Sequence, residues 1–328
     1  MIEFPVILGH EKTIHHFFDA RNSGRLHHAW LLEGIEGIGK SLTAKALAGI
    51  MLGAGYSQEN GQLLLSEDSI TDHLKAGSHP DFRIISAPET DPGKQAAIIP
   101  AEDVRKISQF FSLKPAMGGY RVAILDAMDD LNATGANALL KTLEEPPKNC
   151  LLFLIYHGTA PLLPTIRSRC QKLKFEKLST QALHNVMEQA EAESELNPAL
   201  EKFCSGSPGK WKAYQDASVG TLLSALNSLF GPGWPKPSAS QLQTVIQEMS
   251  RSEIHFDFGL NYLDAWMLKA ASATPHVGQS YLLSNSWTNI RQTAAAGTGL
   301  KLDLTERSAK CLSAIQELAR KLEPQNAV

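Results

Sequence analysis

The first half of the chain alternates short apolar runs with helical patterns. Short runs of apolar residues predict β-strands at residues 29–32, 81–85, 121–126 and 151–156, and residues 171–175 predict a short fifth strand. Between them, apolar residues recur every three or four positions and predict helices, at residues 41–52, 100–113 and 132–145. Apolar strands separated by amphipathic helices indicate a parallel sheet that is covered on both faces.

Beyond residue 176 the helical period dominates and strand-like runs disappear. A helix is predicted over residues 180–193, and Gly206-Ser207-Pro208-Gly209 predicts a break between helices. The last helix has a start signal in Asp303 followed by Glu306.

These patterns divide the chain into three parts. We expect an α/β domain over residues 1–176, a small helical domain over residues 177–216 and an all-helical domain over residues 217–328. A chain of 328 residues is long enough for two or three cores. Residues 53–72 fit neither pattern and are interpreted as a mobile insertion.

Composition and charge narrow the class of protein. The net charge is −3, so any contact with nucleic acid must come from a local patch or from a partner. The first residues lack a signal-peptide pattern, and no apolar run reaches the length of a membrane helix. We therefore expect a cytoplasmic protein without membrane contact. The cysteines lack the C-x-x-C spacing of a zinc site and are expected to be small buried apolar residues, namely Cys150, Cys170, Cys204 and Cys311.

The segment Gly34-Ile35-Glu36-Gly37-Ile38-Gly39-Lys40-Ser41 fits the P-loop pattern, between a predicted strand and a predicted helix. Its glycines, Gly34, Gly37 and Gly39, let backbone N–H groups approach phosphates closely. Lys40 can reach the outer phosphates, and Ser41 can ligate Mg²⁺. The motif predicts binding of ATP with Mg²⁺. The alternative is a degenerate loop that no longer holds nucleotide.

Hydrolysis also needs an acid on a neighbouring strand and a group that positions the attacking water. Asp126 ends an apolar strand and suits the first role, as a ligand of Mg²⁺. Ala127 follows it, and a methyl group cannot polarise water. Asp129 and Asp130 are close in sequence, but we expect their side chains to point elsewhere. These residues favour nucleotide binding without efficient hydrolysis.

Arg169 lies in Ser168-Arg169-Cys170, just after the fourth predicted strand. An arginine at a subunit edge can stabilise charge on a neighbour's γ-phosphate, as an arginine finger. From the residues alone, a surface arginine in a salt bridge is the commoner outcome. Both interpretations stay open at this point.

Four segments together resemble one family, at residues 24–34, 79–82, 137–147 and 168–170. They read Gly-Arg-Leu-His-His-Ala-Trp-Leu-Leu-Glu-Gly, His-Pro-Asp-Phe, Asn-Ala-Leu-Leu-Lys-Thr-Leu-Glu-Glu-Pro-Pro and Ser-Arg-Cys. In order and separation they are similar to the clamp-loader subunits of bacterial DNA polymerase III, a branch of the AAA+ proteins. The resemblance implies an AAA+ P-loop domain, a small helical lid and a helical collar that holds a ring of subunits together.

Within this family the chain is more similar to the delta-prime subunits than to the gamma/tau ATPases, because Ala127 stands where hydrolytic members carry Glu. The resemblance implies that Arg169 completes the ATP site of an adjacent ATPase subunit. It also implies the partners: gamma/tau, delta, the sliding clamp (beta) through the complex, and primed DNA through its backbone phosphates. It further implies that the ATP-bound loader opens the clamp and that DNA-triggered hydrolysis releases it.

Some positions depart from the family pattern. Residues 53–76 contain no cysteine where many relatives carry a zinc module, so no zinc is expected. Tyr156-His157-Gly158 stands where a Thr or Asn usually senses the γ-phosphate, and Gly209 stands where a sensor arginine is usual. These changes weaken hydrolysis further. The intact P-loop leaves room for a nucleotide that only stiffens the domain.

Two other functions compete with this one. An active gamma/tau-like ATPase in its own right is disfavoured by Ala127. A free-standing P-loop kinase would need basic lid residues for a second substrate, and the sequence does not suggest such a lid.

Overall fold

The computed structural model describes residues 6–59, 61–88, 98–189, 198–230, 238–273, 277–299 and 302–322. The chain forms two compact units. The first comprises residues Met1–Glu89, Ala97–Glu195 and Ser205–Lys210, and the second comprises Thr90–Ala96, Leu196–Cys204 and Trp211–Val328. The division into three domains expected from the sequence stays a prediction.

The first unit is built on a five-stranded sheet in the order β4-β5-β6-β1-β7, and all its pairs are parallel. The strands are β1 Ala29–Glu33, β4 Phe82–Ser86, β5 Arg121–Asp126, β6 Cys150–Tyr156 and β7 Gln171–Lys174. Each corresponds to one of the predicted strands. The predicted fold class, a P-loop parallel-sheet domain followed by helical regions, is confirmed.

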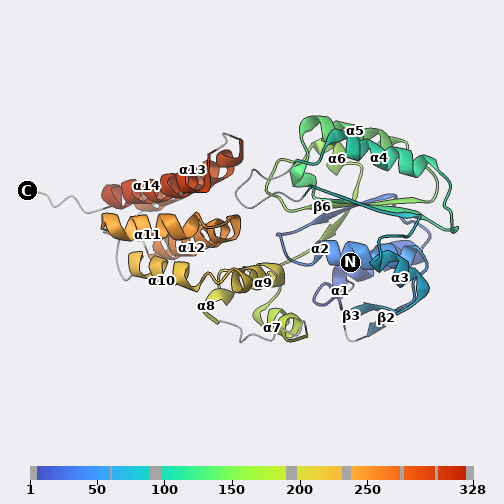
Figure 1. Cartoon of the computed structure of the whole chain (residues 1–328), viewed down its shortest axis with the longest axis horizontal. Helices are drawn as coiled ribbons and strands as arrows, with labels where there is room; N and C mark the ends of the chain where they lie inside the picture. The colour runs from blue at the N-terminus through green and yellow to red at the C-terminus, as the bar shows by residue number, and fades with distance from the viewer. Residues whose placement is uncertain are drawn as a thin grey trace, which may run out of the picture. The chain divides into compact units, whose positions relative to one another are not determined.

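Helices cover both faces of this sheet (Figure 1). One face carries α4 Ala101–Ser112, α5 Ala133–Glu144 and α6 Pro164–Arg167, and the other carries α1 Glu11–Asn22 and α2 Lys40–Met51. Alternate residues of each strand point to opposite faces, so neighbours in sequence enter different cores. Leu31 packs in the cluster that contains α4 and α5, whereas Trp30 contacts the Phe17 ring of α1.

The segment after α2 is ordered, and the expectation of a mobile insertion was wrong. It forms the antiparallel pair β2 Tyr56–Glu59 and β3 Gln62–Leu65, followed by α3 Ser69–Lys75. Its apolar residues are buried, with Leu63 at 1% and Leu74 at 0% exposure. The Asp68 side chain accepts the Thr71 N–H at 2.8 Å and caps α3. Two short strands and one capped helix of seven residues are enough to bury these leucines.

The described part of the second unit is helical. Its long helices are α10 Gly220–Leu229, α11 Ala239–Met249, α12 Glu253–Ala273, α13 Val277–Gly299 and α14 Leu304–Leu322. Asp303 caps α14 by accepting the Glu306 N–H at 2.7 Å, as the sequence predicted. Arg307 pairs with Glu253 at 2.6 Å and joins α14 to α12. Within the described residues, no helix is long and apolar enough to cross a membrane.

The remaining helices are short. They are α7 Thr180–Gln189, α8 Pro198–Glu201 and α9 Pro208–Asp216. The predicted break at residues 206–209 was placed too late, because Pro208 and Gly209 form the first turn of α9. Proline suits this position, since the first N–H groups of a helix have no partner inside it.

Candidate nucleotide-binding site

The glycine-rich segment leaves β1 and enters α2 at Lys40, in the strand–loop–helix order that a P-loop requires. It begins beside β6, where the Gly34 N–H donates to the Tyr156 carbonyl oxygen at 3.3 Å. Gly39 caps α2 with a φ of 104°. A side chain would strain the backbone in this conformation, so the last glycine of the motif is needed for the turn itself.

Lys40 is buried within the loop that it follows. Its Nζ donates to the carbonyl oxygens of Gly34 at 2.6 Å and Ile35 at 2.7 Å, and only 2% of the residue is exposed. Burial lowers the pKa of Lys40 to about 8, and the negative charges of Asp129, Glu36 and Asp126 only partly offset this effect. The loop therefore holds a cation that is poorly solvated and gains from contact with an anion.

The next carbonyl oxygens of the loop are bound by groups outside it. The backbone carbonyl oxygen of Glu36 accepts a hydrogen bond from the Ser207 hydroxyl at 2.9 Å, and that of Gly37 accepts one from the Gly209 N–H at 3.0 Å. The Ile38 carbonyl lies 2.8 Å from Nε2 of His10. A carbonyl only accepts, so Nε2 carries the proton, and burial lowers the pKa of His10 and favours this neutral form.

These contacts join the loop to the start of α9, and we call the segment Ser207–Gly209 the clasp. A Cβ on Gly37 would lie 2.6 Å from the Ser207 hydroxyl oxygen, and a Cβ on Gly209 would lie 2.7 Å from Cα of Gly37. Both glycines are therefore required by close backbone approach. The absence of a sensor arginine at position 209 has a structural reason, because no side chain fits there.

The acidic residues at the end of β5 have separate roles. Asp126 is the last residue of β5 and lies close enough to Lys40 to affect its titration. Asp129 instead accepts the backbone N–H groups of His157 at 2.6 Å and Thr159 at 2.7 Å. Burial alone would raise the pKa of Asp129, but these hydrogen bonds outweigh it and hold the pKa below its usual value. Its carboxylate is thus committed to the loop after β6, and Ala127 is buried at 3% exposure.

His157, in the segment that the resemblance places at the γ-phosphate sensor, lies close to the same site. Its backbone is held by Asp129, and its ring lies within electrostatic range of Lys40 and Glu36. Burial, reinforced by the positive charge of Lys40, lowers the pKa of His157. The ring is therefore neutral near pH 7, which suits a position beside a lysine.

Arg169 is placed away from the loop, between α6 and the edge strand β7. Its Nη1 donates to the Thr165 carbonyl at 2.9 Å, and its Nη2 lies 3.0 Å from Oε1 of Glu144. About a third of the side chain is exposed. The predicted site residues are therefore gathered around Lys40, with the exception of Arg169.

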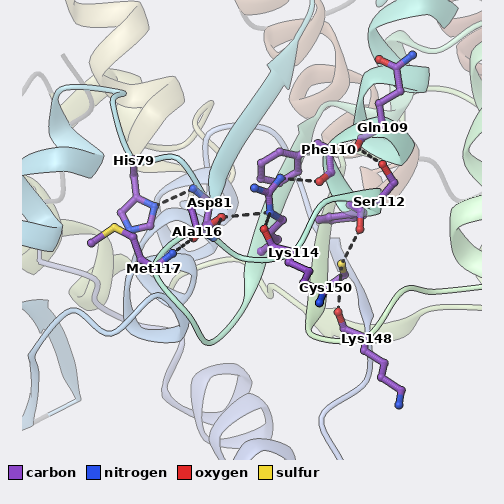
Figure 2. A network of polar contacts seen from close by, with 12 residues as sticks. His79, Asp81, Gln109, Phe110, Ser112, Lys114, Ala116, Met117, Lys148 and Cys150 are labelled. Carbon is purple, nitrogen blue, oxygen red and sulfur yellow. Dashed lines mark hydrogen bonds and ion pairs between the residues drawn. The ribbon is translucent and has the colours of Figure 1, made fainter.

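The His-Pro-Asp-Phe segment has a structural role (Figure 2). The Asp81 carboxylate accepts the N–H groups of Ala116 at 2.9 Å and Met117 at 2.8 Å, and it lies 3.1 Å from Nε of Arg121. Arg121 also donates to the Phe110 carbonyl at 2.7 Å and lies over the Phe110 ring. This buried network fixes the connection between α4 and β5.

The fold and the loop define a P-loop protein of the α/β class. The family model described as DNA polymerase III, delta subunit, matches residues 9–179, more than half of the chain, and the chain belongs to this family. The resemblance inferred from the motifs is confirmed.

Individual relatives carry related names. The chain is 36% identical over 143 residues to DNA polymerase III subunit delta' of Pseudomonas aeruginosa, covering 44% of this chain and 41% of that protein. It is 28% identical over 224 residues to subunit tau of Escherichia coli, covering 68% of this chain and 32% of that protein. These matches span less than half the length of both relatives. A DNA polymerase III gamma subunit-related protein of Thermotoga maritima has a TM-score of 0.41 at 15% identity, covering 95% of this chain and 99% of that one.

Proposed function

We propose that this chain is a delta-prime-type subunit of a DNA polymerase III clamp loader, which helps to place the sliding clamp on primed DNA. Its partners are gamma/tau and delta, the clamp through the complex, and DNA through backbone phosphates. Its catalytic contribution is Arg169, which acts on the ATP site of a neighbouring ATPase subunit. Family membership supports the complex. The partly exposed guanidinium, anchored on one side only, supports the role in trans.

We further propose that the P-loop binds ATP with Mg²⁺. Gly34, Gly37, Gly39 and Lys40 would hold the phosphates, and Ser41 and Asp126 would ligate the metal. The loop fits such an anion because the carbonyls of residues 36–38 are bound from outside. The N–H groups of these peptides point away from the bound carbonyls and could meet phosphate oxygens, and the buried Lys40 supplies the charge.

Hydrolysis at this site is expected to be weak. Ala127 has no group to position water, and Asp129 is held by the loop after β6. The intact P-loop favours one alternative, a gamma/tau-like ATPase. ATP hydrolysis by the isolated chain that is abolished in Lys40→Ala would support that alternative.

Nucleotide binding should depend on pH through Lys40. Phosphate favours the ammonium form, so affinity is highest below the pKa of about 8 and falls as pH rises through it. At pH 9 Lys40 is protonated in only about a tenth of the molecules, and we expect ATP affinity about ten-fold weaker than at pH 7. Titration calorimetry measures this ratio. Lys40→Arg stays charged and should lose most of the dependence; a flat wild-type profile contradicts the role of Lys40.

Arg169→Ala tests the role in trans. In a reconstituted loader, DNA-stimulated ATP hydrolysis should fall at least ten-fold, about 1.4 kcal/mol of barrier, while the ring still assembles. Arg105→Ala removes another exposed arginine, on α4, and serves as the matched control. An unchanged rate in an assembled ring would leave Arg169 as an ordinary surface residue.

A further inference from the structure

Arg169 is held by two elements that the sequence separates. Thr165, whose carbonyl accepts Nη1 at 2.9 Å, belongs to α6. Glu144, whose Oε1 lies 3.0 Å from Nη2, is the last residue of α5. The Ser168 hydroxyl lies 3.5 Å from Nη1 and adds a weaker contact. The guanidinium is therefore gripped along its Nη edge by the ends of two helices that pack together.

We propose that Glu144 is a positioning residue that orients Arg169 toward the γ-phosphate of a nucleotide bound to a neighbouring subunit. This inference rests on the proposed role of Arg169 in trans. It also gives a role to the Leu143-Glu144-Glu145-Pro146-Pro147 segment, which carried the resemblance but had no assigned chemistry. The two prolines end α5, so Glu144 is presented at a defined point rather than within a continuing helix.

The donor inventory of arginine allows both contacts at once. A guanidinium has five N–H donors in a rigid fork. Thr165 and, more weakly, the Ser168 hydroxyl accept from Nη1, and Glu144 accepts from Nη2. Among the contacts of the described residues, none engages Nε. One edge of the fork is thus anchored while donors on the other edge stay available for a phosphate oxygen.

The strength of the pair suits positioning rather than restraint. The Arg169 side chain is partly exposed, at 36%, and that of Glu144 is exposed, at 50%, and ion pairs with this access to water are weak. A single carboxylate in this setting competes poorly with a triphosphate. Glu144 limits the rotamers of the Arg169 side chain before the neighbouring subunit binds. Less side-chain entropy is then lost when Arg169 contacts the phosphate.

The test uses the reconstituted loader with subunits that carry Glu144→Gln, Arg169→Ala or both. We expect Glu144→Gln to lower kcat of DNA-stimulated ATP hydrolysis about five-fold, which corresponds to about 1 kcal/mol, with KM for ATP and ring assembly unchanged. In the Arg169→Ala background, Glu144→Gln should have no further effect, because its action passes through that arginine. Glu145→Gln removes the same charge from the next exposed residue and is the matched control.

The outcomes separate this inference from the function on which it rests. If Arg169→Ala lowers the rate but Glu144→Gln behaves like Glu145→Gln, Arg169 acts in trans and the positioning role is wrong. If Glu144→Gln raises the rate, the pair restrains the arginine, and the proposal is again wrong. If Arg169→Ala itself has no effect in an assembled ring, the proposed function fails and the role of Glu144 fails with it.

Discussion

Asp81→Ala is expected to destabilise the first unit by about 3–5 kcal/mol, because the substitution leaves a buried charge without its partner. The side chains of Asp81 and Arg121 are 0% and 7% exposed. Removal of the carboxylate leaves the Arg121 guanidinium buried without an anionic partner. It also deprives the Ala116 and Met117 N–H groups of their acceptor. Urea denaturation, followed by circular dichroism, measures the loss.

Asp103→Ala is the matched control for this prediction. Asp103 pairs with Lys106 at 2.6 Å, but the two side chains are 35% and 60% exposed. The same substitution there should cost at most about 1 kcal/mol, because water and salt screen an exposed pair. Equal losses in the two variants would show that the Asp81 network contributes no more than a surface pair.

The middle of the sheet could be predicted from sequence because β1, β5 and β6 are short apolar runs with both faces buried. Leu151, Phe153 and Ile155 are fully buried, as are the residues between them, so no polar position interrupts the pattern. The pair β2–β3 could not be predicted in this way. Its strands are short, and β2 is exposed along its length, which leaves no periodic apolar signal.

The candidate site was predictable in part. The P-loop residues are consecutive, so their motif is visible in the sequence. The contacts that shape the loop are not, because Ser207 and Glu36 are 171 positions apart and Asp129 and His157 are 28 apart. No spacing rule links such residues. Only the glycine at position 209, where the family pattern has an arginine, gave a signal, and it was interpreted as a loss rather than as a contact.

The clasp also shows how a P-loop can be shaped from outside. Ser207, Gly209 and His10 bind successive loop carbonyls from two different parts of the chain. Each hydrogen bond holds a carbonyl pointing out of the loop, so the N–H of the same peptide group points into it. These bonds hold the loop in one conformation without a ligand, which would reduce the cost of ordering it on binding the proposed nucleotide.

Gly209→Arg introduces the arginine that the resemblance implies at this position, and it is expected to destabilise the first unit by about 2–3 kcal/mol and not to increase ATP affinity. The collision begins at Cβ, which would lie 2.7 Å from Cα and 2.9 Å from the carbonyl oxygen of Gly37. Both are backbone atoms, so no change of rotamer relieves the contact. Gly209→Ala should therefore destabilise the unit nearly as much as Gly209→Arg.

Gly220 provides the control, because a Cβ there would meet nothing within 4 Å. Gly220 is the first residue of α10. Gly220→Ala and Gly220→Arg should each change the free energy of unfolding by no more than about 1 kcal/mol. Denaturant unfolding compares the four variants, and hydrogen exchange of the P-loop peptide reports on the clasp itself. A stable Gly209→Arg protein with tighter ATP binding would mean that the clasp opens readily and that position 209 still accepts a nucleotide sensor. Loss of stability in both Gly209 variants, with faster exchange at Gly37, would mean that the clasp and a sensor arginine exclude each other, because the backbone contact occupies the space that the side chain would need.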